Sequence, residues 1–137
     1  MRKGWQLCER TTSKVIVPDL WLAVSFWARF VGLQFRRSLP EGAGLLLAPC
    51  NSVHTCFCFF PMDVVFLSRE GVVLEIRRAL RPWRFVSPVK QARYVLETAA
   101  GELSLAVGDQ LALAGPKSES KPKRLQDFPS CDRQETP

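Results

Sequence analysis

Short apolar runs recur along this chain, and glycine, proline or polar turn residues interrupt each run before it reaches the length of a typical helix. Residues 64–67 and 72–76 are two such runs, and the four residues between them, Ser68 to Gly71, are typical of a hairpin turn. The other predicted strands cover residues 5–9, 15–17, 45–48, 53–60, 94–98 and 111–114. Many short strands joined by turns predict a mainly β fold: a small, single-domain β-sandwich or barrel-like fold with one short helix.

One segment has the periodicity of a helix. Phe26, Phe30 and Leu33 recur at spacings of four and three residues, which places them on one apolar face. Ser25 is a suitable N-cap, and Gly32 is a residue type that ends helices in the left-handed conformation. We therefore expect about ten helical residues after Ser25. Residues 20–24 are either a further strand or the lead-in to this helix.

The length of 137 residues corresponds to one domain. We expect residues 1–114 to form this single β-rich domain. Residues 115–137 are polar, charged and aperiodic, and this composition predicts a disordered polar tail.

Composition also bears on the compartment. Residues 4–10 break any apolar run behind the basic start, so no export signal is recognisable. The apolar stretch 15–33 contains Pro18, Asp19 and Arg29 and is unsuited to spanning a bilayer. We therefore expect a cytoplasmic protein without a membrane span. Its five cysteines form no framework spacing, so reduced thiols are expected.

A metal site is suggested by His54, Cys56 and Cys58, whose side chains would point to one face of a strand. Along an extended strand, however, His54 and Cys58 would lie about 13 Å apart. Ligands of one zinc ion must converge to within about 4 Å of one another. We therefore predict no metal site and assign the cysteines to the core, where thiols behave as small hydrophobic groups.

Asp63 interrupts the otherwise apolar run of residues 59–67. A carboxylate there must accept hydrogen bonds, pair with an arginine or lie at an exposed bend. Two interpretations stay open: Asp63 caps or pairs locally after Pro61, or it is a pocket acid near His54. His54 is the chain's single histidine, the residue type that normally titrates near pH 7. Arg29 is our first candidate for the partner of Asp63.

Several motifs follow one another in a recognisable order. The most specific is His54-Thr55 followed by the stretch Pro61 to Leu67. The flanking motifs are residues 25–33, 39–47, Pro49-Cys50, Pro82-Trp83-Arg84, residues 94–97, Gly101 and Gly108-Asp109. Over residues 20–114 this order resembles the domain-of-unknown-function 192 family (DUF192). The resemblance implies a mainly β single domain and brings no assigned activity.

The chain departs from the family pattern directly after the His-Thr pair. Relatives usually carry Phe-Phe-Met-Arg or similar there, whereas this chain has Cys56 to Phe59. Cysteines in place of phenylalanine and methionine favour a core position over metal binding. Phe59 stands where a basic residue is common, which removes one candidate partner of Asp63.

Six basic residues lie between Arg77 and Arg93, together with Trp83 and Phe85. Arginine and aromatic side chains can stack on bases and neutralise phosphates, so the Arg77–Arg93 loop is a candidate nucleic-acid surface. The alternative, which we favour, is a solvated loop in which Trp83 packs inward. Its arginines would then face water or pair with acidic residues, for which the candidates are Glu75, Glu97 and Glu102. The net charge of +6 is compatible with both.

Three functional classes follow from these residues. We expect first an accessory domain that binds a small molecule or a protein partner, with Arg29, Trp83 and Arg84 as the binding residues. The first alternative is an enzyme acting on a small anionic substrate, with His54 and Asp63 as acid and base. The second is nucleic-acid binding through the Arg77–Arg93 loop, which we do not favour. No phosphate-cradling glycine loop and no nucleophile elbow is present, and no cofactor is expected.

Overall fold

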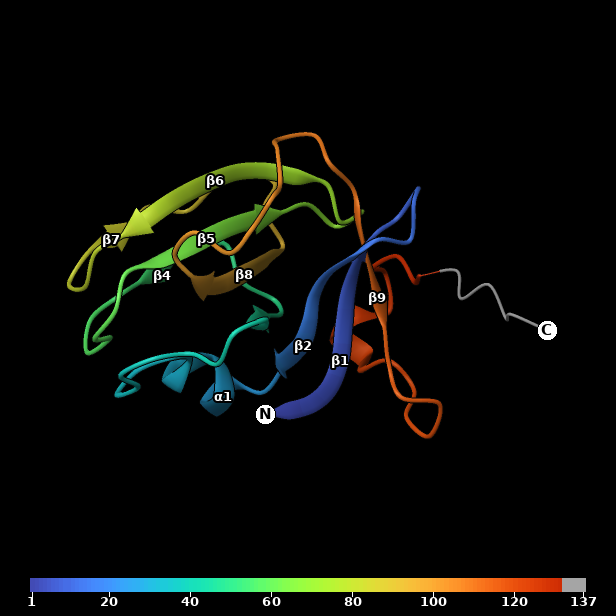
Figure 1. Cartoon of the computed structure of the whole chain (residues 1–137), viewed down its shortest axis with the longest axis horizontal. Coiled ribbons are helices and arrows are strands. Elements are labelled where there is room, and N and C mark those ends of the chain that lie inside the picture. The colour runs from blue at the N-terminus through green and yellow to red at the C-terminus, as the bar shows by residue number, and fades with distance from the viewer. Residues whose placement is uncertain (132–137) are drawn as a thin grey trace.

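Seven strands form one strongly curled sheet in the computed structural model, which describes residues 1–131 (Figure 1). These strands are β1 (Arg2–Glu9), β2 (Val15–Ala23), β3 (Ala43–Leu47), β5 (Met62–Leu67), β6 (Val73–Leu80), β8 (Tyr94–Ala99) and β9 (Leu111–Ala114), and their spatial order is β6-β5-β8-β3-β2-β1-β9. A separate pair is formed by β4 (Val53–His54) and β7 (Phe85–Val86). The helical segments are α1 (Phe26–Val31) and the short 3-10 helix η1 (Lys123–Leu125). The prediction of a mainly β, barrel-like fold is confirmed.

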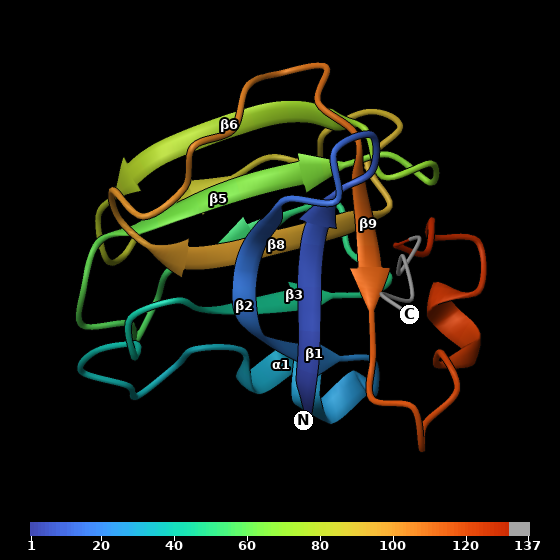
Figure 2. The ribbon, with the colours of Figure 1, turned by 45° about the vertical axis from the view of Figure 1, so that its right-hand side comes forward.

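The curled sheet nearly closes on itself, because its two edge strands approach each other at one end. A bridge joins Val72 to Gln110, and the amide of Val73 donates to the carbonyl of Asp109 at 2.8 Å. The amide of Leu111 in turn donates to the carbonyl of Gly71 at 2.9 Å. β1 and β9 cross the direction of β5 and β8, as the second view shows (Figure 2). The result is a half-barrel whose strands are antiparallel neighbours except for the parallel pair β2–β3.

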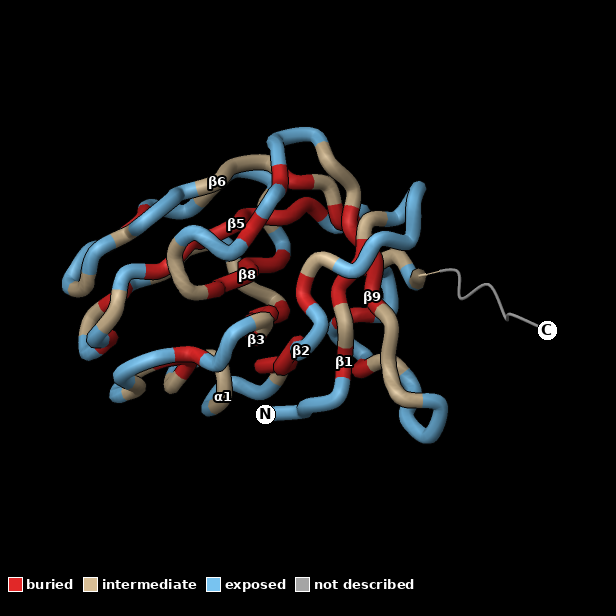
Figure 3. Tube along the Cα trace, viewed as in Figure 1, coloured by how far each residue is buried: buried red, intermediate tan, exposed pale blue. Residues whose placement is uncertain are grey.

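Both faces of the central strands are buried, and this explains their continuous apolar sequence. Along β5, Val65 and Leu67 pack into the barrel interior, whereas Val64 and Phe66 belong to a second apolar cluster on the opposite face. A strand buried on both faces needs no polar alternation. The buried segments lie along these central strands, while the loops around them are mainly exposed (Figure 3).

The second apolar cluster is covered by α1 and by the segments around β4 and β7, and this layer differs from the sequence-based expectation in two places. The predicted strand 53–60 is wrong: only Val53 and His54 are extended, and Phe57 has a φ of 63°. The helix has six residues instead of about ten. The predicted N-cap is confirmed, since the Oγ of Ser25 accepts from the amide of Ala28 at 3.1 Å. Gly32 ends the helix as expected, but its φ of 49° and ψ of −128° are not those of the predicted left-handed helical conformation.

The predicted apolar face of this helix does not face the core. Phe26 and Phe30 are exposed, and Leu33, which lies beyond the helix, is the buried member of the set.

Among the described residues, no helix combines the length and apolar character needed to cross a membrane.

Residues 115–131 pack against the barrel, so the expected disordered tail does not begin after residue 114. Leu125 and Phe128 are buried in the barrel cluster, and the ring of Phe128 meets the ring of Tyr94 edge-on at 5.1 Å. Cys131 forms a disulfide with Cys8 on β1, which corrects the expectation of reduced thiols for this pair. The rest of the expected tail, residues 132–137, lies outside the described residues.

The burial of Phe128 generates the first prediction. Phe128→Ala should lower the free energy of unfolding by about 3–5 kcal/mol, because it leaves a cavity beneath Tyr94. Chemical denaturation followed by fluorescence measures this loss. Val107→Ala, at an exposed apolar residue, is the control and should change stability by less than about 0.5 kcal/mol. A loss of that small size for Phe128→Ala would contradict the packing of residues 115–131.

Candidate functional site

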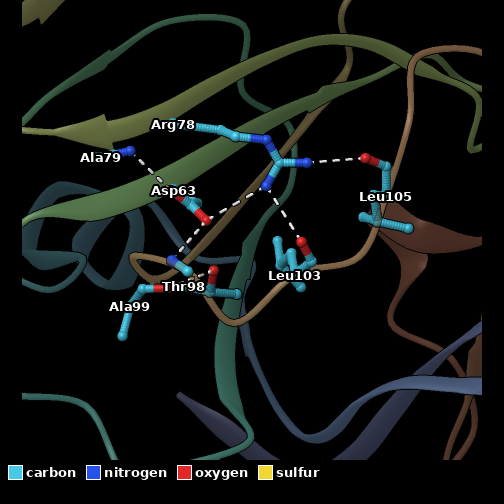
Figure 4. A network of polar contacts seen from close by, with 8 residues as sticks. Asp63, Arg78, Ala79, Thr98, Ala99, Leu103 and Leu105 are labelled. Carbon is cyan, nitrogen blue, oxygen red and sulfur yellow. Dashed lines mark hydrogen bonds and ion pairs between the residues drawn. The ribbon is translucent and has the colours of Figure 1, made fainter.

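The carboxylate of Asp63, one of the two predicted acid–base residues, is buried and bonded to other groups of the protein. Its side chain is 1% exposed. The Oδ1 atom accepts from the amide of Ala79 at 2.8 Å and the Oδ2 atom from the amide of Gly101 at 3.0 Å. The guanidinium of Arg78 lies 3.7 Å from Oδ2 (Figure 4). The carboxylate therefore has three partners, and the expected pairing of Asp63 with Arg29 is wrong.

Two of these partners, the amides of Ala79 and Gly101, are backbone groups at irregular positions of the sheet. The register of β5 against β6 shifts between Met62 and Val64, and Ala79 on β6 has a φ of 51°. Such an irregularity leaves a backbone amide without a partner on the neighbouring strand. Gly101, in the turn after β8, has a φ of 86°. Asp63 accepts from both amides and so stabilises a bulge and a turn that are distant in sequence.

Thr55, the second residue of the His-Thr motif, also forms hydrogen bonds that stabilise the fold. It is fully buried, and its Oγ1 atom donates to the carbonyl of Arg81 at 2.6 Å and accepts from the amide of Arg84 at 2.8 Å. Its own amide donates to the carbonyl of Arg84 at 2.8 Å. The loop containing Pro82, Trp83 and Arg84 is thereby fixed against β4.

His54 and Arg29 meet at a small pocket between α1 and β4. The cavity has a volume of about 100 Å³ and lies over the second apolar cluster. Its lining residues are Arg29, Phe30, Val31, Gly32, Leu33, Gln34, Leu47, Cys50, Ser52, Val53, His54, Cys58 and Glu97. His54 is exposed at the edge of this pocket, with its ring 6.2 Å from that of Phe85. The structure thus brings two of the predicted site residues together.

Glu97, which the sequence analysis considered only as a partner for the arginines, is the buried polar group of this pocket. It lies on β8 and is 5% exposed. Among the described residues, its carboxylate makes no hydrogen bond and no ion pair. Burial raises the pKa of Glu97 from 4.5 to about 7. A buried carboxyl group without a protein partner is costly to the fold, and its position at a pocket makes this pocket the candidate functional site.

Arg29 is held at the same pocket by two backbone carbonyls. Its Nε atom donates to the carbonyl of Ser25 at 3.3 Å, and one terminal nitrogen donates to the carbonyl of Pro49 at 3.0 Å. A guanidinium group has five N–H donors in a fixed planar arrangement. These two bonds therefore orient the group and leave donors for an anionic or carbonyl acceptor.

The two cysteines that line the pocket are protonated at neutral pH. Burial and the nearby Glu97 raise the pKa of Cys58 to about 11, and burial also raises the pKa of Cys50. A thiol with a raised pKa is a poor nucleophile. No group of three potential metal ligands occurs in the part of the chain that the structure describes. The pocket therefore combines a carboxyl group, a guanidinium group and an apolar floor.

Three predicted site residues do not line this pocket. Asp63 belongs to the network around Ala79 and Gly101, and Trp83 and Arg84 lie on the loop that Thr55 holds. Trp83 is 56% exposed, so the expectation that it packs inward is wrong. Of the expected pairs in this region, Arg77 does contact Glu75, at 3.1 Å.

A larger and more open hollow of about 590 Å³ lies near the start of β3 and the end of β8. Its polar lining includes Glu41 and Glu102, which are at least partly exposed, and Thr98, whose hydroxyl donates to the carbonyl of Ala99 at 3.2 Å. None of the predicted site residues lines it. The pocket with Glu97 is the better candidate because its buried carboxyl group lacks a protein partner.

The fold and the pocket define a small half-barrel domain with a polar pocket beneath its short helix. Comparison with known proteins identifies the family of this domain. The DUF192 family model, described as "Uncharacterized ACR", matches residues 7–113. A UPF0127 protein of Pyrococcus furiosus is 35% identical over 109 residues, covering 74% of this chain and 91% of that protein. A UPF0127 protein of Thermococcus sibiricus is 31% identical over 112 residues, covering 77% and 72%. The chain belongs to the DUF192 family, which confirms the resemblance seen in the sequence.

A solved structure shares the fold. A protein of unknown function from Novosphingobium aromaticivorans superposes with a TM-score of 0.68 at 22% identity, covering 77% of this chain and 82% of that one. The family match begins at Leu7, so it includes the end of β1, which lies before the resemblance found in residues 20–114.

The network of Asp63 generates the second prediction. Asp63→Asn should lower the free energy of unfolding by about 2–4 kcal/mol, because an amide NH₂ group replaces one acceptor and faces N–H donors. Urea denaturation measures the loss. Asp109→Asn is the matched control: its Oδ2 atom accepts one exposed hydrogen bond, from the amide of Ala106 at 2.9 Å. Equal, small losses for both variants would refute the structural role of Asp63.

Glu97 generates the third prediction. Its pKa is raised in the folded state, so the wild type loses stability as the pH rises from 4.5 through about 7. Glu97→Gln removes this loss, and the variant should be more stable than the wild type by about 3 kcal/mol at high pH, with no such gain near pH 4. Denaturation at several pH values measures the difference. Glu102→Gln, at an exposed carboxyl group, is the control. A Glu97→Gln difference that does not change with pH would contradict the burial of an unpartnered carboxyl group.

Proposed function

We propose that this protein binds a small polar molecule in the pocket between α1, β4 and β8, called the Glu97 pocket below. The buried, unpartnered carboxyl group of Glu97 carries the proposal. A group of this kind destabilises the empty fold, and a ligand that hydrogen-bonds to it recovers that cost. Asp63 provides the contrast within the same molecule, because its carboxylate already has three protein partners.

The chemistry of the pocket defines the class of ligand. Glu97 favours a hydrogen-bond donor, either an amine or a hydroxyl group, because a cation or donor stabilises a buried carboxylate. Arg29 favours a carboxylate or phosphate oxygen, which it can bind with the donors left over from Ser25 and Pro49. The small cavity limits the buried part of the ligand to a few atoms. We therefore propose a small molecule that carries an amine or hydroxyl group and an acidic group.

An enzyme is the second candidate, and the pKa of Glu97 is the observation that favours it. A carboxyl group with a pKa of about 7 can both donate and accept a proton at neutral pH, as general acid–base catalysis requires. In this alternative Glu97 replaces Asp63 as the acid–base residue, His54 stays a candidate at the pocket edge, and Arg29 holds the anionic substrate.

Nucleic-acid binding through the Arg77–Arg93 loop stays a prediction that we do not favour. Two of its arginines are already engaged, since Arg77 pairs with Glu75 and Arg78 bonds to the carbonyls of Leu103 and Leu105 at 3.1 and 2.9 Å. A cytoplasmic location also stays a prediction, and disulfides such as Cys8–Cys131 are typical of more oxidising surroundings.

Native mass spectrometry of the protein isolated from its own organism tests the proposal. We expect a species heavier than the bare chain by the mass of one small molecule. Glu97→Gln and Arg29→Gln, expressed in the same organism, should each lose this species, whereas the control Glu102→Gln should keep it. A wild-type spectrum that contains only the bare chain, or retention of the ligand by Glu97→Gln, would overturn the proposal. Recovery of two chemically related species that interconvert with active protein would favour the enzyme.

A further inference from the structure

Exposed aromatic side chains are concentrated on one part of this molecule. Among the described residues, eleven large hydrophobic side chains are exposed, and the three that are aliphatic, Met1, Val15 and Val107, lie outside the three chain segments that carry the others. The other eight are aromatic, are 44–79% exposed and lie within residues 24–38, 49–61 and 76–93. We call these eight residues the aromatic rim: Phe26, Trp27, Phe30, Phe35, Phe57, Phe59, Trp83 and Phe85.

Most of these rings contact one another. On α1, the ring of Phe30 lies 6.4 Å from that of Phe26 and 5.8 Å from that of Trp27. A second chain of contacts runs from Phe35 to Phe57 at 5.4 Å and on to Trp83 at 4.8 Å. These six rings form two groups, and exposed rings that pack against one another indicate an interaction site more strongly than single exposed side chains do.

The backbone is strained where it presents three of these rings. Phe35, Phe57 and Trp83 have φ angles of 66°, 63° and 64°, in the left-handed region that bulky residues rarely adopt. Hydrogen bonds hold this geometry: the amide of Phe35 donates to the carbonyl of Phe57 at 2.8 Å, and that of Trp83 to the carbonyl of Thr55 at 3.1 Å. Strain at positions that expose an aromatic ring is a further reason to seek a function for these rings.

The charge of the molecule is segregated in the same way. The three segments that carry the rim contain nine of the 19 lysines and arginines and none of the 13 aspartates and glutamates. The rest of the chain is therefore slightly acidic, although the whole carries a net charge of +6. Arg37, Arg81 and Arg84 are exposed among the rings. Arg77 and Arg78 pair with Glu75 and Asp63, which lie just outside these segments, whereas Arg37, Arg81 and Arg84 form no ion pair among the described residues. The rim thus combines apolar rings with exposed arginines.

We infer that the aromatic rim docks on the surface of an anionic lipid bilayer, with its rings in the interfacial region and its arginines against the lipid headgroups. Aromatic and basic side chains together are the pattern of proteins that lie in this interface. Six of the eight rings are phenylalanines, which carry no hydrogen-bonding group and therefore suit the apolar part of a lipid interface. Phe30 also lines the Glu97 pocket, whose volume of about 100 Å³ is too small to hold a polymer chain.

Co-sedimentation with lipid vesicles tests this inference. We expect the full chain to bind vesicles of phosphatidylcholine with added phosphatidylglycerol, and to bind vesicles of phosphatidylcholine alone at least about tenfold more weakly. Added salt should weaken the binding, because screening reduces the attraction of the arginines to the headgroups.

Two variants separate the contributions of rings and charges. The double variant Phe26→Ser, Trp27→Ser should lower the affinity about tenfold or more. Arg37→Gln with Arg84→Gln should abolish the preference for the anionic vesicles. Val107→Ser is the control, since Val107 is a comparably exposed apolar residue outside the rim. Both Phe26 and Trp27 are exposed, so thermal unfolding of the double variant should match that of the wild type.

Several outcomes would overturn the inference. These are absence of binding to either vesicle, binding that the Phe26→Ser, Trp27→Ser variant retains in full, binding of RNA or DNA instead of vesicles, and self-association that the same variant removes. The last two would assign the rim to a nucleic acid or to a second copy of the chain. Loss of vesicle binding in Phe26→Ser, Trp27→Ser with normal binding by Val107→Ser would support it.

Discussion

The carboxylate of Asp63 connects two parts of the fold that the hydrogen bonds between strands do not join. It accepts from Ala79 at the bulge of β6 and from Gly101 in the turn after β8, and Arg78 lies beside it. Arg78 extends the network to the carbonyls of Leu103 and Leu105 (Figure 4). These contacts connect the bulge of β6 to the turn after β8 and to the chain that follows it.

A second buried carboxyl group lies on the neighbouring strand and has the opposite character. Val64, which follows Asp63, is the register partner of Glu97, so the two acidic residues lie close in the sheet. Asp63 has three partners, whereas Glu97 has none among the described residues and its pKa is raised to about 7. Burial alone therefore does not distinguish these two carboxyl groups; the number of hydrogen-bond donors around each of them does.

Features set by local sequence could be predicted, and those set by distant contacts could not. The turn at Ser68 to Gly71 and the helix caps at Ser25 and Gly32 depend on neighbouring residues alone. The burial of Phe128 depends on Tyr94, far away in sequence, and composition gave no sign of it. The rule that selected Asp63, a carboxylate within an apolar strand, applies equally to Glu97. Sequence alone does not reveal which of the two receives backbone donors.

Glu97 is a buried carboxyl group without a protein partner among the described residues, and its titration tests this most directly. The side-chain carboxyl carbon of Glu97 can be followed by NMR as the pH is changed in the ligand-free protein, with Glu97→Gln used to assign the signal. We expect the titration of Glu97 to have its midpoint near pH 7. A midpoint near 4.5, the ordinary value for glutamate, would contradict it.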